Sequence, residues 1–204
     1  MKIINLTQNS SLYTCNVYLV TGSWNALQDL NTLVDVGRDS SIIDKINNYA
    51  TGIGKHKIDQ VILTHSHYDH ASLLPDIKQI YHPKTYAYSS SLQFIDRTVS
   101  DGYKIKLGDT WFEVIYAPGH SSDSICLYSK SAHVLFSGDL PFIIKTAQGT
   151  YEEHFLLLLK RLSNLNIDII YPGHGPPIGG NCTELITHSL SIINSNYSSI
   201  HLGG

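Results

Sequence analysis

The sequence has 204 residues, 42% of them hydrophobic and 15% charged, and a formal net charge of −3. This length and composition predict one globular domain over residues 1–204 with a substantial core. The slightly acidic balance argues against a nucleic-acid partner, and eleven histidines are many for this length.

Cysteine usage and apolar runs bear on the compartment. Cys15, Cys126 and Cys182 are widely separated and form neither a zinc knuckle nor a disulfide framework. We therefore expect three reduced thiols in a cytoplasmic protein. Residues 1–6 lack the apolar core of a signal peptide, and the longest apolar run, 155–159, is far too short to span a membrane. The expectation is a soluble protein without a membrane partner, and its oligomeric state is not predicted.

Short apolar runs between turn residues predict strands. In chain order these cover 2–6, 16–20, 32–37, 60–63, 80–82, 85–88, 103–107, 110–116, 123–128, 133–136 and 167–171. Helical patterns cover 41–50, 71–78, 91–97, a stretch ending near 164 and a stretch ending near 196. We expect Pro75 to interrupt the second of these helices. The order of the elements predicts two sheets with helices on their outer faces.

Polar residues mark where several helices and one hairpin begin. Capping pairs precede four of the helices, namely Ser41 with Asp44, Ser90 with Gln93, Thr150 with Glu153 and Asn181 with Glu184. The dipeptide Gly108-Asp109 predicts a hairpin turn between the strands 103–107 and 110–116.

The stretch 64–70 carries four candidate metal ligands, His65, His67, Asp69 and His70, directly after an apolar strand. Side chains two residues apart in extended backbone project to the same side, so His65 and His67 can reach one ion. Asp69 and His70 follow where the chain turns, and they can point to a second ion beside the first. The alternative interpretation is a set of surface or core histidines without a metal.

Three further candidates, His120, Asp139 and His174, each follow an apolar strand and a glycine. Glycine lets the backbone turn tightly, so that a ligand after it can face inward. Asp35 is an acidic residue in the otherwise apolar strand 32–37. Without Asp35, the stretch 64–70 and the three strand ends supply five histidines and two aspartates as candidate ligands.

These motifs, in this order, resemble the metallo-β-lactamase superfamily of hydrolases over essentially the whole chain. The resemblance implies an α+β fold, an αβ/βα four-layer sandwich of two mixed β-sheets with helices on the outer faces and a metal pair in the cleft between the sheets. It also implies a ligand assignment, in which the first ion is bound by His65, His67 and His120 and the second by Asp69, His70 and His174. Asp139 would bridge both ions, and Asp35 would be a buried residue that orients the ligand loop.

Imidazole and carboxylate ligands suit zinc, and also iron or manganese. Two such ions can share a hydroxide that forms near neutral pH and attacks a carbonyl group. We therefore expect a metal-dependent hydrolase of a small ester, thioester or lactone, with two divalent ions, most favourably zinc, and with Asp69 and Asp139 as catalytic residues. Its partner would be a small-molecule substrate. The segments 7–15, 21–31 and 140–150 are expected to form the substrate pocket.

Departures from subfamily patterns narrow this expectation. The β-lactamases that resemble this chain commonly carry cysteine where it has Asp139, and the flavo-diiron oxygen reductases usually carry glutamate where it has His67, so both are disfavoured. Hydroxyacylglutathione hydrolases share all the proposed ligands but add a C-terminal domain with basic residues for glutathione. Only residues 175–204 follow His174 here, and 181–204 contain no Lys or Arg. Little dependence on a glutathionyl group is therefore expected.

Two alternatives stay open at this point. Persulfide dioxygenases retain the same motifs but bind one iron, through counterparts of His65, His120 and Asp139. A non-catalytic metal-binding module is the other. Metal analysis and a substrate panel distinguish the three.

Overall fold

The computed structural model describes residues 1–144 and 152–201, with the side chains of the last helix described as far as Ile193. Two six-stranded sheets form its centre. The first contains, in spatial order, β1 (Lys2–Asn5), β2 (Tyr18–Thr21), β3 (Thr32–Val34), β4 (Gln60–Ile62), β5 (Lys84–Ala87) and β6 (Arg97–Thr98). The second contains β12 (Ile178–Gly179), β11 (Ile169–Pro172), β10 (Val134–Gly138), β9 (Ile125–Ser129), β8 (Thr110–Tyr116) and β7 (Lys104–Leu107).

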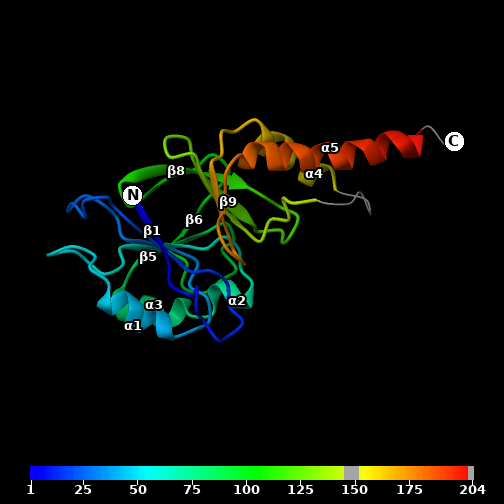
Figure 1. Cartoon of the computed structure of the whole chain (residues 1–204). Helices are drawn as coiled ribbons and strands as arrows, with labels where there is room; N and C mark the ends of the chain where they lie inside the picture. Colours follow the sequence, from blue (N-terminus) through cyan, green and yellow to red (C-terminus); the bar gives the residue numbers. More distant parts are fainter. Residues whose placement is uncertain (145–151, 202–204) are drawn as a thin grey trace.

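Both sheets are mixed. In the first, β3, β4, β5 and β6 run parallel to one another, whereas β1 and β2 are antiparallel to their neighbours. In the second, only β10 and β11 are parallel. The helices are α1 (Ser41–Asn48), α2 (Tyr68–Ala71), α3 (Leu74–Tyr81), α4 (Glu153–Ser163) and α5 (Cys182–His201). Figure 1 shows α1 and α3 on one side of the sandwich and α4 and α5 on the other, which confirms the predicted α+β four-layer architecture.

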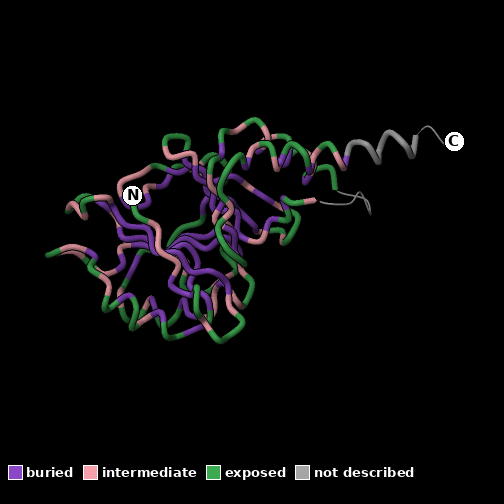
Figure 2. Tube along the Cα trace, in the orientation of Figure 1, coloured by how far each residue is buried: buried purple, intermediate pink, exposed green. Residues whose placement is uncertain are grey.

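Three apolar layers hold these elements together, because successive residues of a strand face opposite sides of its sheet. In β2, Leu19 packs outward in the cluster that includes Ile42 of α1 and Ile77 of α3, whereas Tyr18 and Val20 pack inward between the sheets. Burial is therefore concentrated along the central strands, as Figure 2 shows. Each fully buried Leu or Ile contributes about 1.5–3 kcal/mol to the free energy of unfolding.

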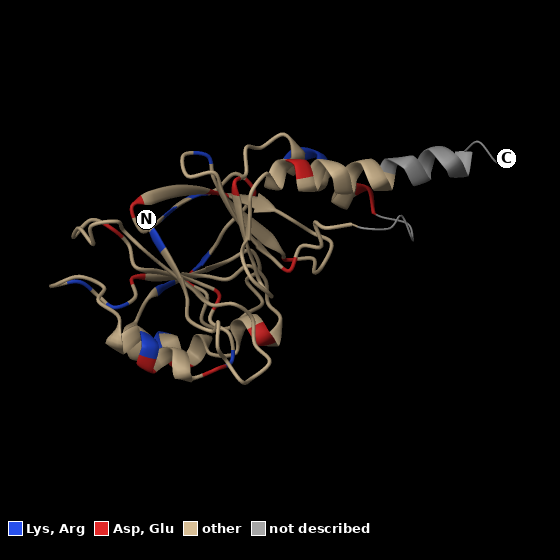
Figure 3. Cartoon of the chain, viewed as in Figure 1, with Lys and Arg blue, Asp and Glu red and all other residues tan. Residues whose placement is uncertain are grey.

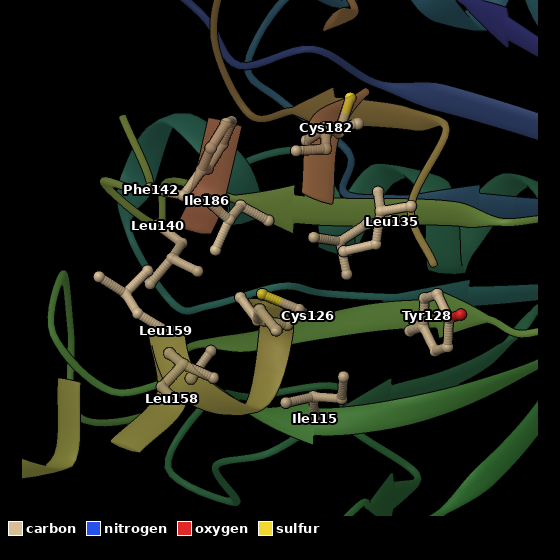
Figure 4. Packing of buried hydrophobic residues seen from close by; sticks show 14 of the residues in the cluster. Ile115, Cys126, Tyr128, Leu135, Leu140, Phe142, Leu158, Leu159, Cys182 and Ile186 are labelled. Carbon is tan, nitrogen blue, oxygen red and sulfur yellow. The ribbon is translucent and has the colours of Figure 1, made fainter. Parts of the chain in front are cut away.

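The third layer lies between the second sheet and the helices α4 and α5. Figure 4 shows Leu158 and Leu159 of α4 and Ile186 of α5 packed near the strand residues Ile115 and Cys126. The outer surfaces of the helices carry charges of both signs, as Asp44 and Lys45 do on α1 (Figure 3). Among the helices within residues 1–144 and 152–201, none is long and apolar enough to cross a bilayer.

The region after residues 64–70 differs from the prediction. Residues 80–82 are not a strand, because α3 continues to Tyr81 and ends at His82, which has a left-handed backbone with φ of 52°. Pro75 lies in the first turn of α3, and the break between α2 and α3 at residues 72 and 73 lies directly before that turn, so the predicted interruption near Pro75 is confirmed. Proline cannot donate a backbone hydrogen bond to the preceding turn, but none is needed in the first turn of a helix, so Pro75 is accommodated there.

The helix predicted over 91–97 is also wrong. Its last residue begins β6, which pairs in parallel with β5. The Asp96 carboxylate accepts a hydrogen bond from the backbone N–H of Thr85 at 2.8 Å, and the Asp96 N–H donates to the Thr85 carbonyl at 3.0 Å. These long-range bonds to β5 outweigh the local helical pattern.

The predicted helix caps have different outcomes. The residue before α1 is Ser40, whose side chain makes no capping hydrogen bond. Ser41 is the first residue of the helix, and its N–H donates to Asp39 Oδ1 at 3.0 Å. The predicted capping pair of Ser41 and Asp44 is therefore wrong. Asn181 is confirmed, since its Oδ1 accepts the Glu184 N–H at 3.1 Å. The pair starting at Thr150 lies outside the described residues.

The predicted hairpin at Gly108 is confirmed. Leu107 pairs with Thr110 across the turn. Gly108 has a φ of +59°, and a Cβ there would lie 2.6 Å from the carbonyl oxygen of Thr21. The position therefore requires glycine for both its backbone conformation and its close approach to the first sheet.

Candidate metal centre

Strand ends from both sheets bring the predicted ligands to one place. His65 and His67 follow β4, and Asp69 and His70 lie in the single turn of α2 directly after them. The second sheet contributes one residue after each of three strands, namely His120 after β8, Asp139 after β10 and His174 after β11. All seven predicted residues therefore meet at one edge of the sandwich, although they span more than half of the chain.

One group consists of His65, His67 and His120, whose ligand atoms lie within 4.8 Å of one another. The ring centroid of His65 is 4.6 Å from that of His67 and 4.8 Å from that of His120. His120 Nε2 is 2.9 Å from His67 Nδ1. Three imidazoles in this arrangement could hold one metal ion.

A second group consists of Asp69, His70 and His174, again with ligand atoms within 4.8 Å of one another. His174 Nε2 is 3.0 Å from Asp69 Oδ2, and His70 Nε2 is 4.0 Å from the same oxygen. A carboxylate and two imidazoles could hold another ion here.

Asp139 lies between the two groups. Its Oδ1 is 3.3 Å from His70 Nε2, and its Oδ2 is 3.5 Å from both His120 Nε2 and His174 Nε2. His65, His70 and Asp139 also form a third set of ligand atoms within 4.8 Å of one another. One carboxylate therefore reaches both groups.

The chemistry of these atoms fits a metal ion. Among the described buried side chains, seven nitrogen or oxygen atoms have no hydrogen-bond partner, and four of them belong to the predicted ligands: His65 Nε2, His70 Nε2, Asp139 Oδ1 and His174 Nε2. An unpaired buried polar atom costs about 1–3 kcal/mol. Four such atoms pointing into one region are explained if they converge on ions.

Asp35 holds the two buried imidazoles, that of His70 directly and that of His65 through Thr64. Its Oδ2 accepts from His70 Nδ1 at 2.9 Å and from the Thr64 hydroxyl at 2.8 Å, and its Oδ1 accepts from the Thr64 N–H at 2.7 Å. Because the Thr64 hydroxyl donates to Asp35, it accepts from His65 Nδ1 at 3.2 Å. Both histidines therefore keep a proton on Nδ1, and Nε2 is the ring atom that would bind an ion.

Asp35 reaches this position through an uncommon backbone conformation. Its φ is +60°, a left-handed value that aspartate and asparagine tolerate better than most residues. Its N–H donates to the Ile62 carbonyl at 3.0 Å, which keeps it beside the end of β4. Asp35 was predicted from the sequence and Thr64 was not, because the only signal for Thr64 was its place directly before His65.

The ionisation states also suit metal binding. Burial, aided by the nearby His70, lowers the pKa of His65 to about 4, so this ring is neutral at neutral pH. Burial opposes the charge on Asp139, but His174 and His70 outweigh it and hold the pKa of Asp139 well below its usual range. Burial likewise opposes charge on His70, but the Asp35 and Asp139 carboxylates raise the pKa of His70. A metal ion bound at His70 Nε2 would displace the second proton of this ring.

The loop that carries His174 is fixed by Asn16, a residue that the sequence did not indicate. The Asn16 N–H donates to the Gly173 carbonyl at 2.6 Å, and its side-chain amide donates to the carbonyls of Pro172 at 2.9 Å and Gly175 at 2.7 Å. A Cβ at Gly173 would lie 2.1 Å from Asp139 Oδ1 and 2.8 Å from His70 Cε1. Glycine is required there so that the loop can approach the ligands.

Two neighbours of the centre differ in role. Tyr13 is 73% exposed, and its ring stacks on that of His174 with centroids 5.4 Å apart. Cys15 lies with Asp35 and His70 in a buried group of potential ligands. Burial raises the pKa of Cys15 to about 12, however, so its thiol stays protonated, and Asp35 is already engaged by Thr64 and His70. This group is structural.

Comparisons with known proteins identify the family. Residues 11–174 match the metallo-beta-lactamase superfamily. An atrochrysone carboxyl ACP thioesterase from Aspergillus fumigatus is 27% identical over 177 residues, which cover 81% of this chain and 42% of that protein. A hydroxyacylglutathione hydrolase from Francisella tularensis subsp. novicida is 34% identical over 124 residues, which cover 58% of this chain and 49% of that protein.

Among solved structures, ETHE1 from Myxococcus xanthus superposes with a TM-score of 0.69 at 17% identity and covers 95% of this chain and 88% of its own. The chain spans about half the length of the curated relatives that it matches. Since the family match extends over most of the sequence and the fold agrees with it, the chain belongs to the metallo-β-lactamase superfamily.

Proposed function

We propose that this protein is a hydrolase that uses two divalent metal ions, most favourably zinc, to cleave a small ester, thioester or lactone. The observation that carries the proposal is the convergence on Asp139 of three buried imidazole nitrogens that make no hydrogen bond, those of His65, His70 and His174. The superfamily supports a hydrolase, as do the two relatives, whose names are those of a thioesterase and a hydroxyacylglutathione hydrolase.

In this proposal the two ligand groups each hold one ion, and Asp139 contacts both. His65, His67 and His120 form the first group, and Asp69, His70 and His174 the second. Ions bound there would act as Lewis acids and would lower the pKa of water towards neutrality. Asp69 and Asp139 are the proposed catalytic carboxylates, because they lie among the imidazoles and supply the negative charge of the centre.

The chain's own contribution is to aim and to hold these groups. Asp35 and Thr64 fix the protons of His65 and His70 on Nδ1, so both Nε2 atoms face the centre without rearrangement. Asn16 holds the His174 loop on the opposite side. His67 and His120 are exposed, which leaves that side of the centre open to a substrate.

One other chemistry has a specific observation in its favour. His65, His120 and Asp139, the set expected for a single iron in a persulfide dioxygenase, also lie together, with His120 Nε2 3.5 Å from Asp139 Oδ2. With that set alone, Asp69, His70 and His174 would bind no ion. The two-ion hydrolase uses all the converging residues and is therefore preferred.

Metal content measured together with turnover tests the proposal. Protein purified without chelator is analysed for metals and assayed on a panel of small esters, thioesters and lactones, with chelated and reloaded protein as the matched control. We expect two ions per chain and turnover that chelation removes and reloading restores. One iron per chain with oxygen uptake would establish the dioxygenase instead. No turnover of any substrate by fully loaded protein would leave a non-catalytic metal-binding module.

We also propose that the protein works in the cytoplasm on a small-molecule substrate. Cys15, Cys126 and Cys182 are all free and buried, which suits a reducing compartment. Fractionation of the native host with detection of the chain tests this; recovery from an oxidising compartment would contradict it.

A further inference from the structure

A cavity of about 540 Å³ opens directly beside the candidate metal centre. His120, Asp139 and His174 form part of its wall, so a molecule in it touches both ligand groups. This volume lies within the range of small-molecule sites in proteins. The cavity is therefore placed to hold one substituent of a carbonyl group that reacts at the centre.

The rest of the described wall is apolar. The segment after β10 contributes Leu140, Phe142 and Ile143, and the chain around β11 and β12 contributes Pro172 and Ile178. Apart from the three candidate ligands, every described residue that lines the cavity is apolar or glycine. A charged group of a substrate would lose water there without gaining a partner from this wall, which is unfavourable.

Part of this wall is packed into the protein core. Leu140 is 4% exposed and Phe142 is 5% exposed, and both belong to the apolar cluster beneath α4 and α5. Figure 4 shows them close to Ile186 and Leu159. The Ile144 N–H donates to the Ser189 hydroxyl of α5 at 3.0 Å, which anchors the segment that carries them. The apolar wall is therefore built into the fold and does not depend on bound substrate.

We infer that this cavity binds an apolar, uncharged acyl chain, so that the substrate is an alkanoyl ester or thioester with a polar leaving group. The inference rests on the proposed hydrolase function and names its substrate class. The acyl part is assigned to the cavity because ACP and glutathione, the thiol carriers in the names of the two relatives, are polar and unsuited to an apolar wall.

The primary experiment is an acyl series on the metal-loaded protein. N-acetylcysteamine thioesters from acetyl to hexanoyl keep one small polar leaving group while the acyl chain grows. A buried methylene contributes about 0.8 kcal/mol, so kcat/KM is expected to rise about fourfold for each methylene until the cavity is filled. A series of S-alkyl leaving groups on a constant acetyl group is the reciprocal arm, and we expect it to show no such gradient.

A charge placed in the wall sharpens the test. Ile143 is 40% exposed, so the fold should tolerate Ile143→Lys, which brings an ammonium group to the cavity. We expect the preference for pentanoyl over glutaryl thioester, which have equal chain length, to fall at least tenfold in this variant. Ile80→Lys is the matched control, because Ile80 is 47% exposed on α3 and does not line the cavity. It should leave the preference unchanged.

Calorimetry of non-hydrolysable S-alkyl thioether analogues separates this inference from the proposed function. Affinity that increases with chain length, with a negative heat-capacity change, supports the apolar cavity even if no substrate is turned over. A flat acyl series in an active enzyme overturns the inference and leaves the hydrolase standing. A gradient confined to the leaving-group arm, or a glutaryl preference in the unmodified protein, also overturns it.

Discussion

The two sides of the candidate metal centre differ in burial and in what holds their imidazoles. On the buried side, the His70 side chain is fully buried and bonded to Asp35, whose side chain is 2% exposed. On the open side, the side chains of His120 and His174 are 31% and 34% exposed, and their nearest polar neighbours are other candidate ligands. The fold therefore holds the imidazoles of the buried side in place, whereas the side chains of the open side are held mainly by one another.

This difference suggests separate roles for the two sides in the proposed metal centre. In the proposed metal centre, the buried side chains would need no ion to keep their direction, so they would provide its fixed part. The exposed side chains would be the ones to adjust when ions and substrate bind. Four changes, given in order of decreasing expected effect, test this division.

The largest effect is expected for Asp139→Ala, because this carboxylate contacts both sides. We predict that kcat/KM falls by about a thousandfold or more and that metal content drops for both ions. Elemental analysis and steady-state kinetics measure this. Asp76→Ala, on the surface of α3, is the matched control and should behave as the unmodified protein. Full metal content with full turnover in Asp139→Ala would disprove the bridging role.

The buried side alone is broken by Asp35→Asn. Asparagine tolerates the φ of +60° as aspartate does, so the backbone is preserved. One carboxylate oxygen becomes an NH2 donor, however, so the side chain can no longer accept all three hydrogen bonds that Asp35 accepts from Thr64 and His70. We predict a 10- to 100-fold loss of metal affinity and a loss of about 1–3 kcal/mol of stability in the metal-free chain.

Metal titration and denaturant unfolding measure the two effects of Asp35→Asn. Asp44→Asn on α1 provides the matched control. A variant that binds metal normally would show that Asp35 supports the fold and not the ligands.

The open side alone is broken by His174→Ala. Because this side chain is 34% exposed, we expect less than about 1 kcal/mol of lost stability. The ion held with Asp69 and His70 should be lost while the other is kept, so metal content falls from two to one per chain. His188→Ala, at an exposed position of α5, is the control. Loss of both ions would show that the two groups do not bind independently.

The smallest effect concerns protonation in the metal-free chain. The lowered pKa of His65, to about 4, and the raised pKa of His70 have opposite signs. Relative to an unfolded histidine pKa near 6.5, His65 costs stability as the pH falls from about 6.5 to 4. His70 contributes stability that is complete below about pH 6.5 and is lost as the pH rises through its raised pKa.

Imidazole NMR shifts of the metal-free chain, with the urea-unfolded chain as reference, report these two titrations directly. At pH 6 we expect His65 to be neutral and His70 to be charged. Titration of both rings near pH 6.5 would mean that the buried side is not preorganised without metal.

Much of the architecture followed from local patterns. The strand preceding His65, the hairpin at Gly108 and the start of α5 at Asn181 are set by residues adjacent in the sequence, so they could be predicted. So could the candidate ligands, since each follows an apolar strand whose end must lie at a sheet edge. Their grouping, with ligand atoms within 4.8 Å of one another, does not follow from that pattern alone.

Only the tertiary structure decided the rest. The segment 91–97 became a loop and a short strand because Thr85, on β5, bonds to Asp96. Asn16 holds the His174 loop across more than 150 residues, a contact that no local pattern encodes. The apolar cavity wall likewise joins residues of distant segments. The physical reason is common to all three: neighbours in the chain determine strand ends and turns, but a long-range hydrogen bond or cavity depends on how the two sheets pack.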